Sequence, residues 1–412
     1  MDRSLTEYEN VVGPAVIEQL RQVGEKLRGV RIVHVNSTME GGGVAEILGW
    51  MVPLMRDLGI DAHWKAIKGT NDFFSITKAI HNGLQGNPVV LTPKDWETYV
   101  DINVQNLDTL REALEEAEIV VIHDPQPAPL LQLCPNRRGK WIWRAHIDIS
   151  NPFRPVWKAL RPFVEKYDAS IFSIPQFAQF LTHPQFIIAP SIDPLSEKNM
   201  DLDHEDLKKV YNEFKLDSER PILVQISRFD RFKDPVGVIQ AYRLVRKVIP
   251  AQLVLAGGGA TDDPEGSAFL EEVIGAADGD PDIHVLSLPP DVHTTINALQ
   301  RVADIVIQKS TREGFGLTVT EGLWKGKPVI GGDVGGIKLQ VVNHYTGFLV
   351  NTPEGAAHRI RFLLHHPERM QEMGKTAQEY VRQNFLLTRH IRDYLILILC
   401  LIRNTREHRI LV

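Results

Sequence analysis

Short runs of aliphatic and β-branched residues alternate with longer segments of helical periodicity along the chain, and this alternation occurs in two series. It is typical of parallel βαβ units. We therefore expect an α/β protein of two doubly wound, Rossmann-like domains that face each other across a cleft and bind ligands at the carboxyl ends of their strands. The strands predicted for the first series cover residues 30–37, 87–93, 117–125, 140–148 and 169–175. Those predicted for the second series cover residues 221–227, 251–259, 283–289, 303–310, 327–333 and 346–351.

A segment rich in prolines and charges, residues 186–206, separates the two series as a domain junction would. It predicts an N-terminal Rossmann-like domain over residues 1–188 and a second Rossmann-like domain over residues 189–384. The closing segment, residues 377–404, is predicted to be helical, and its many Leu and Ile side chains need a surface to cover. We expect its last part, residues 385–412, to pack back across the domains.

The composition excludes several functional classes. With 412 residues, 43% of them hydrophobic, 24% charged and a net charge of −6, the chain has the profile of a large globular protein without general affinity for nucleic acid. The two cysteines, Cys134 and Cys400, are too few for a disulfide framework or a zinc cluster, which favours a reducing cytoplasm. The N-terminus lacks the apolar core of a signal peptide, and the apolar run at 394–402 is short of the roughly 20 residues that span a bilayer.

A triple-glycine turn at residues 41–43 follows the first predicted strand and leads into a helix, in the sequence "HVNSTMEGGGVAEIL". Glycines let the backbone approach a ligand, and the start of a helix attracts anions, so we place Gly42 and Gly43 at a ligand site. A plain tight turn is the structural alternative. The consecutive glycines do not have the G-x-G-x-x-G spacing, so a nicotinamide dehydrogenase is disfavoured even though Asp61 lies near the expected distance.

Two cations follow the first strand of the second series, in "QISRFDRFKDPVGVIQAY". Arg228 ends the strand and Lys233 precedes a helix. A solvated surface position is the ordinary explanation for either residue alone. At the carboxyl end of a parallel strand, however, the pair can neutralise a diphosphate.

Two glutamates, Glu313 and Glu321, bracket a glycine-containing helix start in "STREGFGLTVTEGLW", residues 310–324. The helix start offers amides to a phosphate, whereas carboxylates bind neutral hydroxyl groups by charge-assisted hydrogen bonds. A sugar nucleotide has this layout, with hydroxyl groups on both sides of a diphosphate. For Glu321, an exposed position on the helix surface is the alternative. The candidate amide donors are Gly314, Phe315, Gly316 and Leu317.

Three ionisable residues, Arg144, His146 and Asp148, alternate after a tryptophan-rich strand in "RAHIDISNPF". Alternation places them on one face of an extended segment, where they form a candidate acceptor site. A purely structural histidine is the alternative. The Asp-x-Asp pairs within 201–203 and 278–282 are interpreted as solvated turns, so no metal site is predicted.

With these motifs in place, the chain resembles the retaining glycosyltransferases of the two-domain GT-B architecture, specifically the large family 4 that includes sucrose and trehalose synthases. The resemblance runs from the glycines at 41–43 through Arg228 and Lys233 to "EGFGLTVTE". The stretches "HVNSTMEGGGVAEIL" and "RAHIDISNPF" are similar, more narrowly, to trehalose glycosyltransferring synthases and to their trehalose phosphorylase relatives.

The resemblance implies that glucose passes from a nucleoside diphosphate glucose to the anomeric oxygen of free glucose and gives α,α-trehalose, without metal or other cofactor. By similarity, Glu313 would bind hydroxyl groups of the donor sugar and Glu321 the ribose, while Gly316 and Leu317 would contribute amides. The expected partners are these small molecules, with neither nucleic acid nor membrane, and a homodimer is the assembly considered. The residues implied in catalysis are Glu313, Arg228, Lys233 and His146.

One departure from the family pattern concerns Ser227 and Asp234, which stand where many members have glycine. An acid beside the diphosphate site could weaken donor binding or favour another leaving group. A trehalose phosphorylase that uses inorganic phosphate, or a family 4 enzyme with another acceptor, remains an alternative, although Glu321 favours a nucleotide. A binding or sensing module is a further alternative, which turnover would exclude. The nucleobase, the physiological direction and the oligomeric state are left open.

Overall fold

In the computed structural model, the chain forms two compact units. The first unit runs to Ser191 and also includes the segment from Leu387 onward, and the second unit is Ile192–Leu386. The described residues are 3–40, 42–258, 264–289 and 292–403. Gly41, the last residue of the strand predicted at 251–259 and the end of the predicted closing helix lie outside them.

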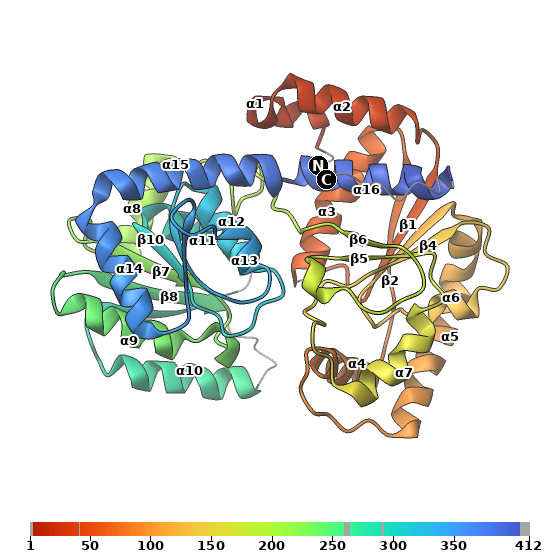
Figure 1. Ribbon diagram of the computed structural model, residues 1–412, viewed down its shortest axis with the longest axis horizontal. Helices are drawn as coiled ribbons and strands as arrows, with labels where there is room; N and C mark the ends of the chain where they lie inside the picture. Colours follow the sequence, from red (N-terminus) through yellow and green to blue (C-terminus); the bar gives the residue numbers. More distant parts are fainter. Residues whose placement is uncertain (1–2, 41, 259–263, 290–291, 404–412) are drawn as a thin grey trace. The chain divides into compact units, whose positions relative to one another are not determined.

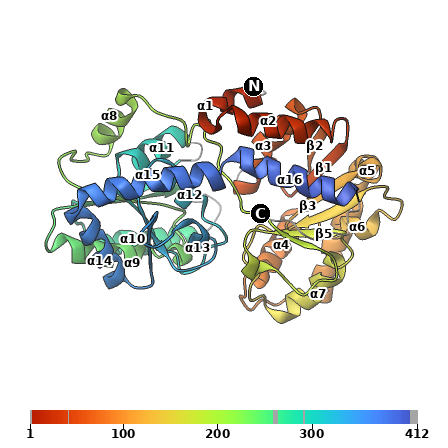
Figure 2. The same ribbon diagram turned by 45° about the horizontal axis from the view of Figure 1, so that its top comes forward.

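The first unit is built on a parallel sheet of six strands in the order β2-β1-β3-β4-β5-β6 (Figure 1). Helices α2, α3 and α16 lie on one side of this sheet, and α4, α5 and α7 lie on the other (Figures 1 and 2). The strands are β1 (Arg31–Asn36), β2 (Asp61–Ala66), β3 (Ile119–His123), β4 (Lys140–Arg144), β5 (Ala169–Phe172) and β6 (Gln185–Ile187). The α-helices are α1 (Glu9–Val12), α2 (Pro14–Glu25), α3 (Gly42–Asp57), α4 (Asn71–Leu84), α5 (Pro93–Glu116), α6 (Leu130–Leu133), α7 (Arg154–Val164) and α16 (Leu387–Ile402).

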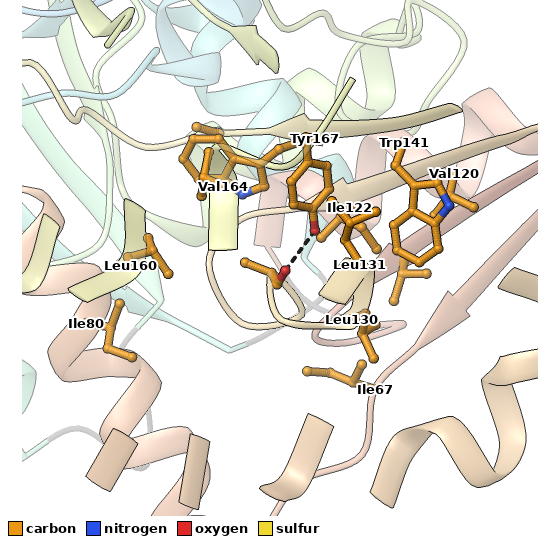
Figure 3. Packing of buried hydrophobic residues seen from close by; sticks show 14 of the residues in the cluster. Ile67, Ile80, Val120, Ile122, Leu130, Leu131, Trp141, Leu160, Val164 and Tyr167 are labelled. Carbon is orange, nitrogen blue, oxygen red and sulfur yellow. Dashed lines mark hydrogen bonds between the residues drawn. The ribbon is translucent and has the colours of Figure 1, made fainter. Parts of the chain in front are cut away.

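Aromatic side chains fill the core on the α5 side of this sheet. Figure 3 shows Trp141 near Val120 and Tyr167, whose hydroxyl group donates a hydrogen bond to the carbonyl of Ala128 (2.9 Å). Burying a large apolar side chain contributes about 1.5–3 kcal/mol. Because the tyrosine hydroxyl finds a partner, this burial carries no desolvation penalty for an unsatisfied polar group.

The second unit repeats the plan with a parallel sheet in the order β12-β11-β10-β7-β8-β9. Its strands are β7 (Ile222–Ile226), β8 (Gln252–Gly258), β9 (Ile283–Leu288), β10 (Ile305–Gln308), β11 (Val329–Gly332) and β12 (Gly347–Val350). Its α-helices are α8 (His204–Glu213), α9 (Pro235–Arg246), α10 (Pro264–Ala277), α11 (His293–Val302), α12 (Leu317–Trp324), α13 (Ile337–Gln340), α14 (Pro353–His365) and α15 (Pro367–Asn384). All six strands predicted for the second series are present, and the two-domain Rossmann-like fold is confirmed.

Two predictions in the first unit were wrong. Residues 87–92 form no strand: Val90 is 92% exposed, and the segment leads into α5, which starts at a capping box built by Thr92 and Asp95. The strand predicted over 140–148 ends at Arg144. Strand β2 was missed because it lies at the edge of the sheet, where only half of its residues need to be apolar.

The predicted closing helix is also interrupted. Helix α15 ends at Asn384, and α16 begins at Leu387 and packs against α2 and α3 of the first unit. Its apolar run is partly buried: Tyr394 and Leu395 lie in the core, whereas Ile396 is exposed.

Candidate active site

Two loops of the second unit meet at the carboxyl edge of its sheet. The β7 loop (residues 227–234) follows β7, and the β10 loop (residues 309–316) follows β10. Strands β7 and β10 are parallel neighbours, so both loops leave the sheet at the same edge. The amide of Thr311 donates a hydrogen bond to the carbonyl of Phe232 (2.8 Å), which joins the two loops directly.

Lys233 and Glu313, two predicted site residues, form an ion pair between these loops. The Nζ atom of Lys233 lies 2.5 Å from Oε2 of Glu313, and the two side chains are 18% and 10% exposed. Ser310 donates a further hydrogen bond to the same carboxylate (3.3 Å), and Gln225 donates one to the carbonyl of Lys233 (2.8 Å). The structure therefore brings the predicted cation and the predicted carboxylate together in one partly buried network.

Arg228, the second predicted cation, is not part of this network. Its side chain is 71% exposed, and its charge lies 3.8 Å from the carboxylate of Asp230. The guanidinium group therefore extends into solvent from the same loop that carries Lys233.

Asp234 adopts a left-handed backbone conformation, with φ at +51°. Glycine is the residue that adopts such a conformation without steric cost, and aspartate is among the few others that tolerate it. The carboxylate caps α9 by accepting a hydrogen bond from the amide of Gly237 (3.1 Å), and it also forms an ion pair with Lys309. Sequence reasoning missed Lys309, although a lysine directly after the apolar strand "IVIQ" was a visible signal.

The β10 loop holds its shape through close packing at the start of α12. Gly316, the N-cap residue, has φ at +85°, and Gln340 donates a hydrogen bond to the carbonyl of Phe315 (2.7 Å). A Cβ atom on Gly335 would lie 1.7 Å from the carbonyl oxygen of Glu313, so only glycine fits there. The predicted amide donors Gly314, Phe315, Gly316 and Leu317 therefore belong to one fixed turn at the positive end of a helix.

Glu321 lies on α12 but not on its exposed surface, so the surface alternative was wrong. The side chain is buried, and Gln300 lies 3.4 Å from its Oε2 atom. Lys325, one helical turn further on, is also buried, and its ammonium group donates to the side chain of Asn199 (3.2 Å). Burial lowers the pKa of Lys325 to about 7, although the charge of Glu321 acts in the opposite direction. Sequence reasoning missed this lysine.

In the first unit, the glycine turn follows β1. Gly42 has φ at +81° and opens α3, in which Gly43 is the second residue. A Cβ atom on Gly42 would meet nothing within 4 Å, so the backbone conformation and not the available space favours glycine there.

The predicted acceptor residues lie in different surroundings. Arg144 ends β4 and is fully buried, with one hydrogen bond to Ser173 (3.3 Å). Its Nε and Nη1 atoms have no hydrogen-bond partner among the described residues. His146 is partly exposed in the loop beyond, and Asp148 accepts hydrogen bonds from the amide and the hydroxyl group of Ser150 (2.9 and 2.6 Å). The expected shared face of an extended segment is therefore absent, because the strand stops at Arg144.

His146 ends a chain of three histidines that sequence reasoning did not detect. Nδ1 of His34 lies 3.0 Å from Nε2 of His123, and Nδ1 of His123 lies 2.9 Å from Nε2 of His146. These residues come from β1, from β3 and from the loop after β4, which are neighbours in the sheet. In the sequence, each of three predicted strands has a histidine in it or just after it. This pattern indicates a contact between the histidines only once the order of the strands in the sheet is known.

Burial keeps this histidine chain neutral. It lowers the pKa of His34 to about 3, and it places the pKa values of His123 and His146 well below the usual range, with nearby cationic groups acting in the same direction. The neighbouring Asp124 accepts a hydrogen bond from the amide of His146 (2.8 Å), and burial raises its pKa to about 6. At neutral pH the partly exposed end of the histidine chain, His146, is therefore an uncharged imidazole that can exchange hydrogen bonds with hydroxyl groups.

Among the described residues, no group of three or more His, Cys, Asp and Glu side chains has the arrangement of a metal site. In the same part of the chain, no helix is long and apolar enough to cross a bilayer.

Two doubly wound parallel sheets form the two-domain architecture of GT-B glycosyltransferases, and the comparisons with known proteins place the chain in that class. A family model described as the N-terminal domain of trehalose synthase matches residues 34–179, and one for group 1 glycosyl transferases matches residues 208–380. The trehalose synthase of Thermococcus litoralis is 47% identical over 398 residues, which cover 95% of this chain and 96% of that protein. The chain belongs to the trehalose synthase family.

Other relatives are more distant. A trehalose phosphorylase of Pleurotus pulmonarius is 28% identical over 408 residues, which cover 86% of this chain but only 54% of that protein. An E. coli trehalose-6-phosphate structure bound with UDP-2-fluoro glucose matches with a TM-score of 0.73 at 13% identity, covering 89% of this chain and 98% of that one, and shows a shared fold.

Proposed function

We propose that this chain transfers glucose from a nucleoside diphosphate α-glucose to the anomeric hydroxyl group of free glucose, with retention of configuration, to give α,α-trehalose. The observation that carries the proposal is the ion pair of Lys233 and Glu313 beside the start of α12. One donor molecule supplies both partners that this pair needs: a diphosphate for the lysine and sugar hydroxyl groups for the glutamate. The names of the relatives support trehalose as the product.

Donor binding exchanges one set of charge-assisted contacts for another. Lys233 and Glu313 neutralise each other in this structure, and their pair is only 10–18% exposed. On donor binding, the ammonium group turns to the diphosphate and the carboxylate turns to the glucose. Each charge therefore keeps a partner, which limits the desolvation cost of binding.

The departing diphosphate gains negative charge as the glycosidic bond breaks. Lys233, the guanidinium group of Arg228 and the amides of the fixed turn at 314–317 can stabilise that charge without a metal ion. The exposed position of Arg228 suits a side chain that moves onto a bound ligand. We therefore propose metal-independent catalysis without a cofactor, as for a retaining enzyme of family 4.

The acceptor contacts are assigned to the first unit. His146 is the partly exposed end of a neutral histidine chain, so it can bind a glucose hydroxyl group directly. Arg144 is fully buried and supports the acceptor site from behind, and Asp148 shapes the loop through its bonds to Ser150. The low cysteine content supports a reducing, cytoplasmic setting.

A comparison of two leaving groups tests the proposed function. Glucose is incubated with UDP-, ADP- or GDP-glucose, and separately with α-glucose 1-phosphate, while nucleoside diphosphate and phosphate release are measured. We expect glucose-dependent release of a nucleoside diphosphate. Turnover with glucose 1-phosphate but with none of the nucleoside diphosphate glucoses would establish the phosphorylase alternative. No turnover with any donor would favour a binding module.

A further inference from the structure

We propose that Lys309 is a positioning residue of the donor site whose ion pair with Asp234 cancels a fixed negative charge next to Lys233. This inference rests on the proposed function, because it concerns how the β7 loop receives a diphosphate. It explains how the β7 loop accommodates an acid beside the lysine that is proposed to bind the diphosphate.

Burial makes Lys309 dependent on its partner. The lysine side chain is only 6% exposed, and that of Asp234 is 24% exposed. A lysine this deeply buried is rarely left unpaired, because removing its charge from water is costly. Lys309 directly follows β10 and precedes Ser310, which contacts Glu313, so the pair lies within the same network as the candidate diphosphate clamp.

The carboxylate of Asp234 has little freedom to turn away. Its backbone is left-handed, with φ at +51°, and one carboxylate oxygen accepts the amide hydrogen bond of Gly237 (3.1 Å). A Cβ atom on Gly237 would lie 2.3 Å from the other carboxylate oxygen, so the helix start closes tightly around the acid. Without Lys309, Asp234 would therefore remain a fixed negative charge one residue from Lys233.

Other contacts already join the two loops. The amide of Thr311 donates to the carbonyl of Phe232 (2.8 Å), and Lys233 pairs with Glu313 across the two loops (2.5 Å). The pair of Lys309 and Asp234 is therefore not needed as a tether. Its consequence is electrostatic: it removes a repulsive charge from the site where the diphosphate is proposed to bind.

This electrostatic role predicts effects of opposite sign from two single substitutions. Lys309→Met leaves the carboxylate unpaired and should weaken binding of a nucleoside diphosphate about tenfold, as expected for one unit charge within several ångströms of the ligand. Asp234→Asn keeps a residue that tolerates the left-handed conformation and removes the negative charge, and Lys309 then has the bound diphosphate as the anion to pair with, so binding should tighten by a similar factor. The double variant should return to within about threefold of the wild type.

Isothermal titration of the full chain with UDP, ADP and GDP first identifies the best ligand, and that ligand is then titrated into the three variants. Lys209→Met, on α8, is the control, because it removes a lysine that pairs with Asp206 on the exposed surface. The opposite shifts of the single variants should shrink at 0.5 M salt, where charges are screened within a few ångströms. Circular dichroism and the melting temperature report whether each variant folds. If Lys309→Met does not fold, Lys309→Gln is used in its place.

Weakening by both single substitutions would overturn the inference and leave a structural role for the pair. Unchanged binding in all variants would overturn it as well. A wild-type chain that binds a nucleoside diphosphate and turns over its glucose adduct, but shows no opposite shifts, contradicts this inference alone. A wild-type chain that binds none of the three nucleoside diphosphates contradicts the proposed function and this inference together.

Discussion

Acidification is expected to destabilise the first unit through its buried histidines. The pKa of His34 is lowered to about 3 in the folded chain, against a usual value near 6.5. The unfolded chain therefore binds a proton between pH 6.5 and 3 that the folded chain excludes, and the free energy of unfolding falls as the pH falls through this range. Between pH 7.5 and pH 5, protonation of the imidazole of His34 stabilises the unfolded chain by a factor of about 30. This lowers the free energy of unfolding by about 2 kcal/mol for this one fully buried residue.

Neighbouring groups decide the net size of this effect. His123, His146 and His390 also have pKa values well below the usual range because of burial, so they act in the same direction as His34. Asp124 acts in the opposite direction, because burial raises its pKa to about 6, and acidification to pH 5 returns roughly 1.4 kcal/mol of stability. The histidines outnumber the acid, so we expect a net loss.

Tryptophan fluorescence can follow the first unit selectively, because of the seven tryptophans only Trp324 belongs to the second unit. Urea unfolding followed by fluorescence at pH 7.5, 6 and 5 gives the free energy of unfolding of the first unit at each pH. His34→Gln should reduce its loss between pH 7.5 and 5 by about 2 kcal/mol. The control is His63→Gln, at a half-exposed histidine of the same sheet. A pH dependence that is absent in the wild type, or equal in wild type and His34→Gln, would refute this reasoning.

Three further predictions concern the donor site. Lys233→Ala and Arg228→Ala should each lower kcat/KM about a hundredfold, because each removes a cation that stabilises the departing diphosphate. Near-wild-type values of kcat/KM in both variants would contradict the proposed contact of these cations with the diphosphate. Glu313→Gln should lower turnover but preserve or strengthen the affinity for free nucleoside diphosphate, because it releases Lys233. Glu321→Gln should weaken that affinity by roughly 1.5–3 kcal/mol. Calorimetry that shows equal weakening by both substitutions would contradict these roles. Activity should survive EDTA, and loss of activity with rescue by magnesium would contradict metal independence.

Much of the fold follows from the sequence because most strands are buried on both faces. Strands β7 and β10, with the sequences "ILVQI" and "IVIQ", are apolar except for one glutamine each and are therefore recognisable. The edge strand β2, "DAHWKA", interrupts its pattern with polar residues. The apolar run near Val90 forms no strand: Val89 and Leu91 are partly buried, and Val90 is exposed. The edge position of β2 accounts for the missed strand, whereas the segment before α5 shows that a short apolar run does not by itself establish a strand.

The sequence allowed single site residues to be selected within each loop, but it did not reveal which residues of different loops contact one another. Sequence reasoning selected Lys233 and Glu313 separately, but their ion pair depends on β7 and β10 being neighbours, which the order along the chain does not reveal. The pair of Lys309 and Asp234 and the histidine chain behind His146 were missed for the same reason. Contacts between strands that are distant in sequence require the sheet order.

The configuration of the product tests the central claim most directly. Glucose is supplied unlabelled, together with a nucleoside diphosphate α-glucose that carries ¹³C at C1 of the sugar, and the purified product is examined by ¹³C NMR. Retaining transfer to the anomeric oxygen predicts one labelled α-anomeric carbon in a non-reducing disaccharide whose unlabelled anomeric carbon is also α. A labelled β-anomeric carbon, or a product that still reduces copper reagents, would contradict the account.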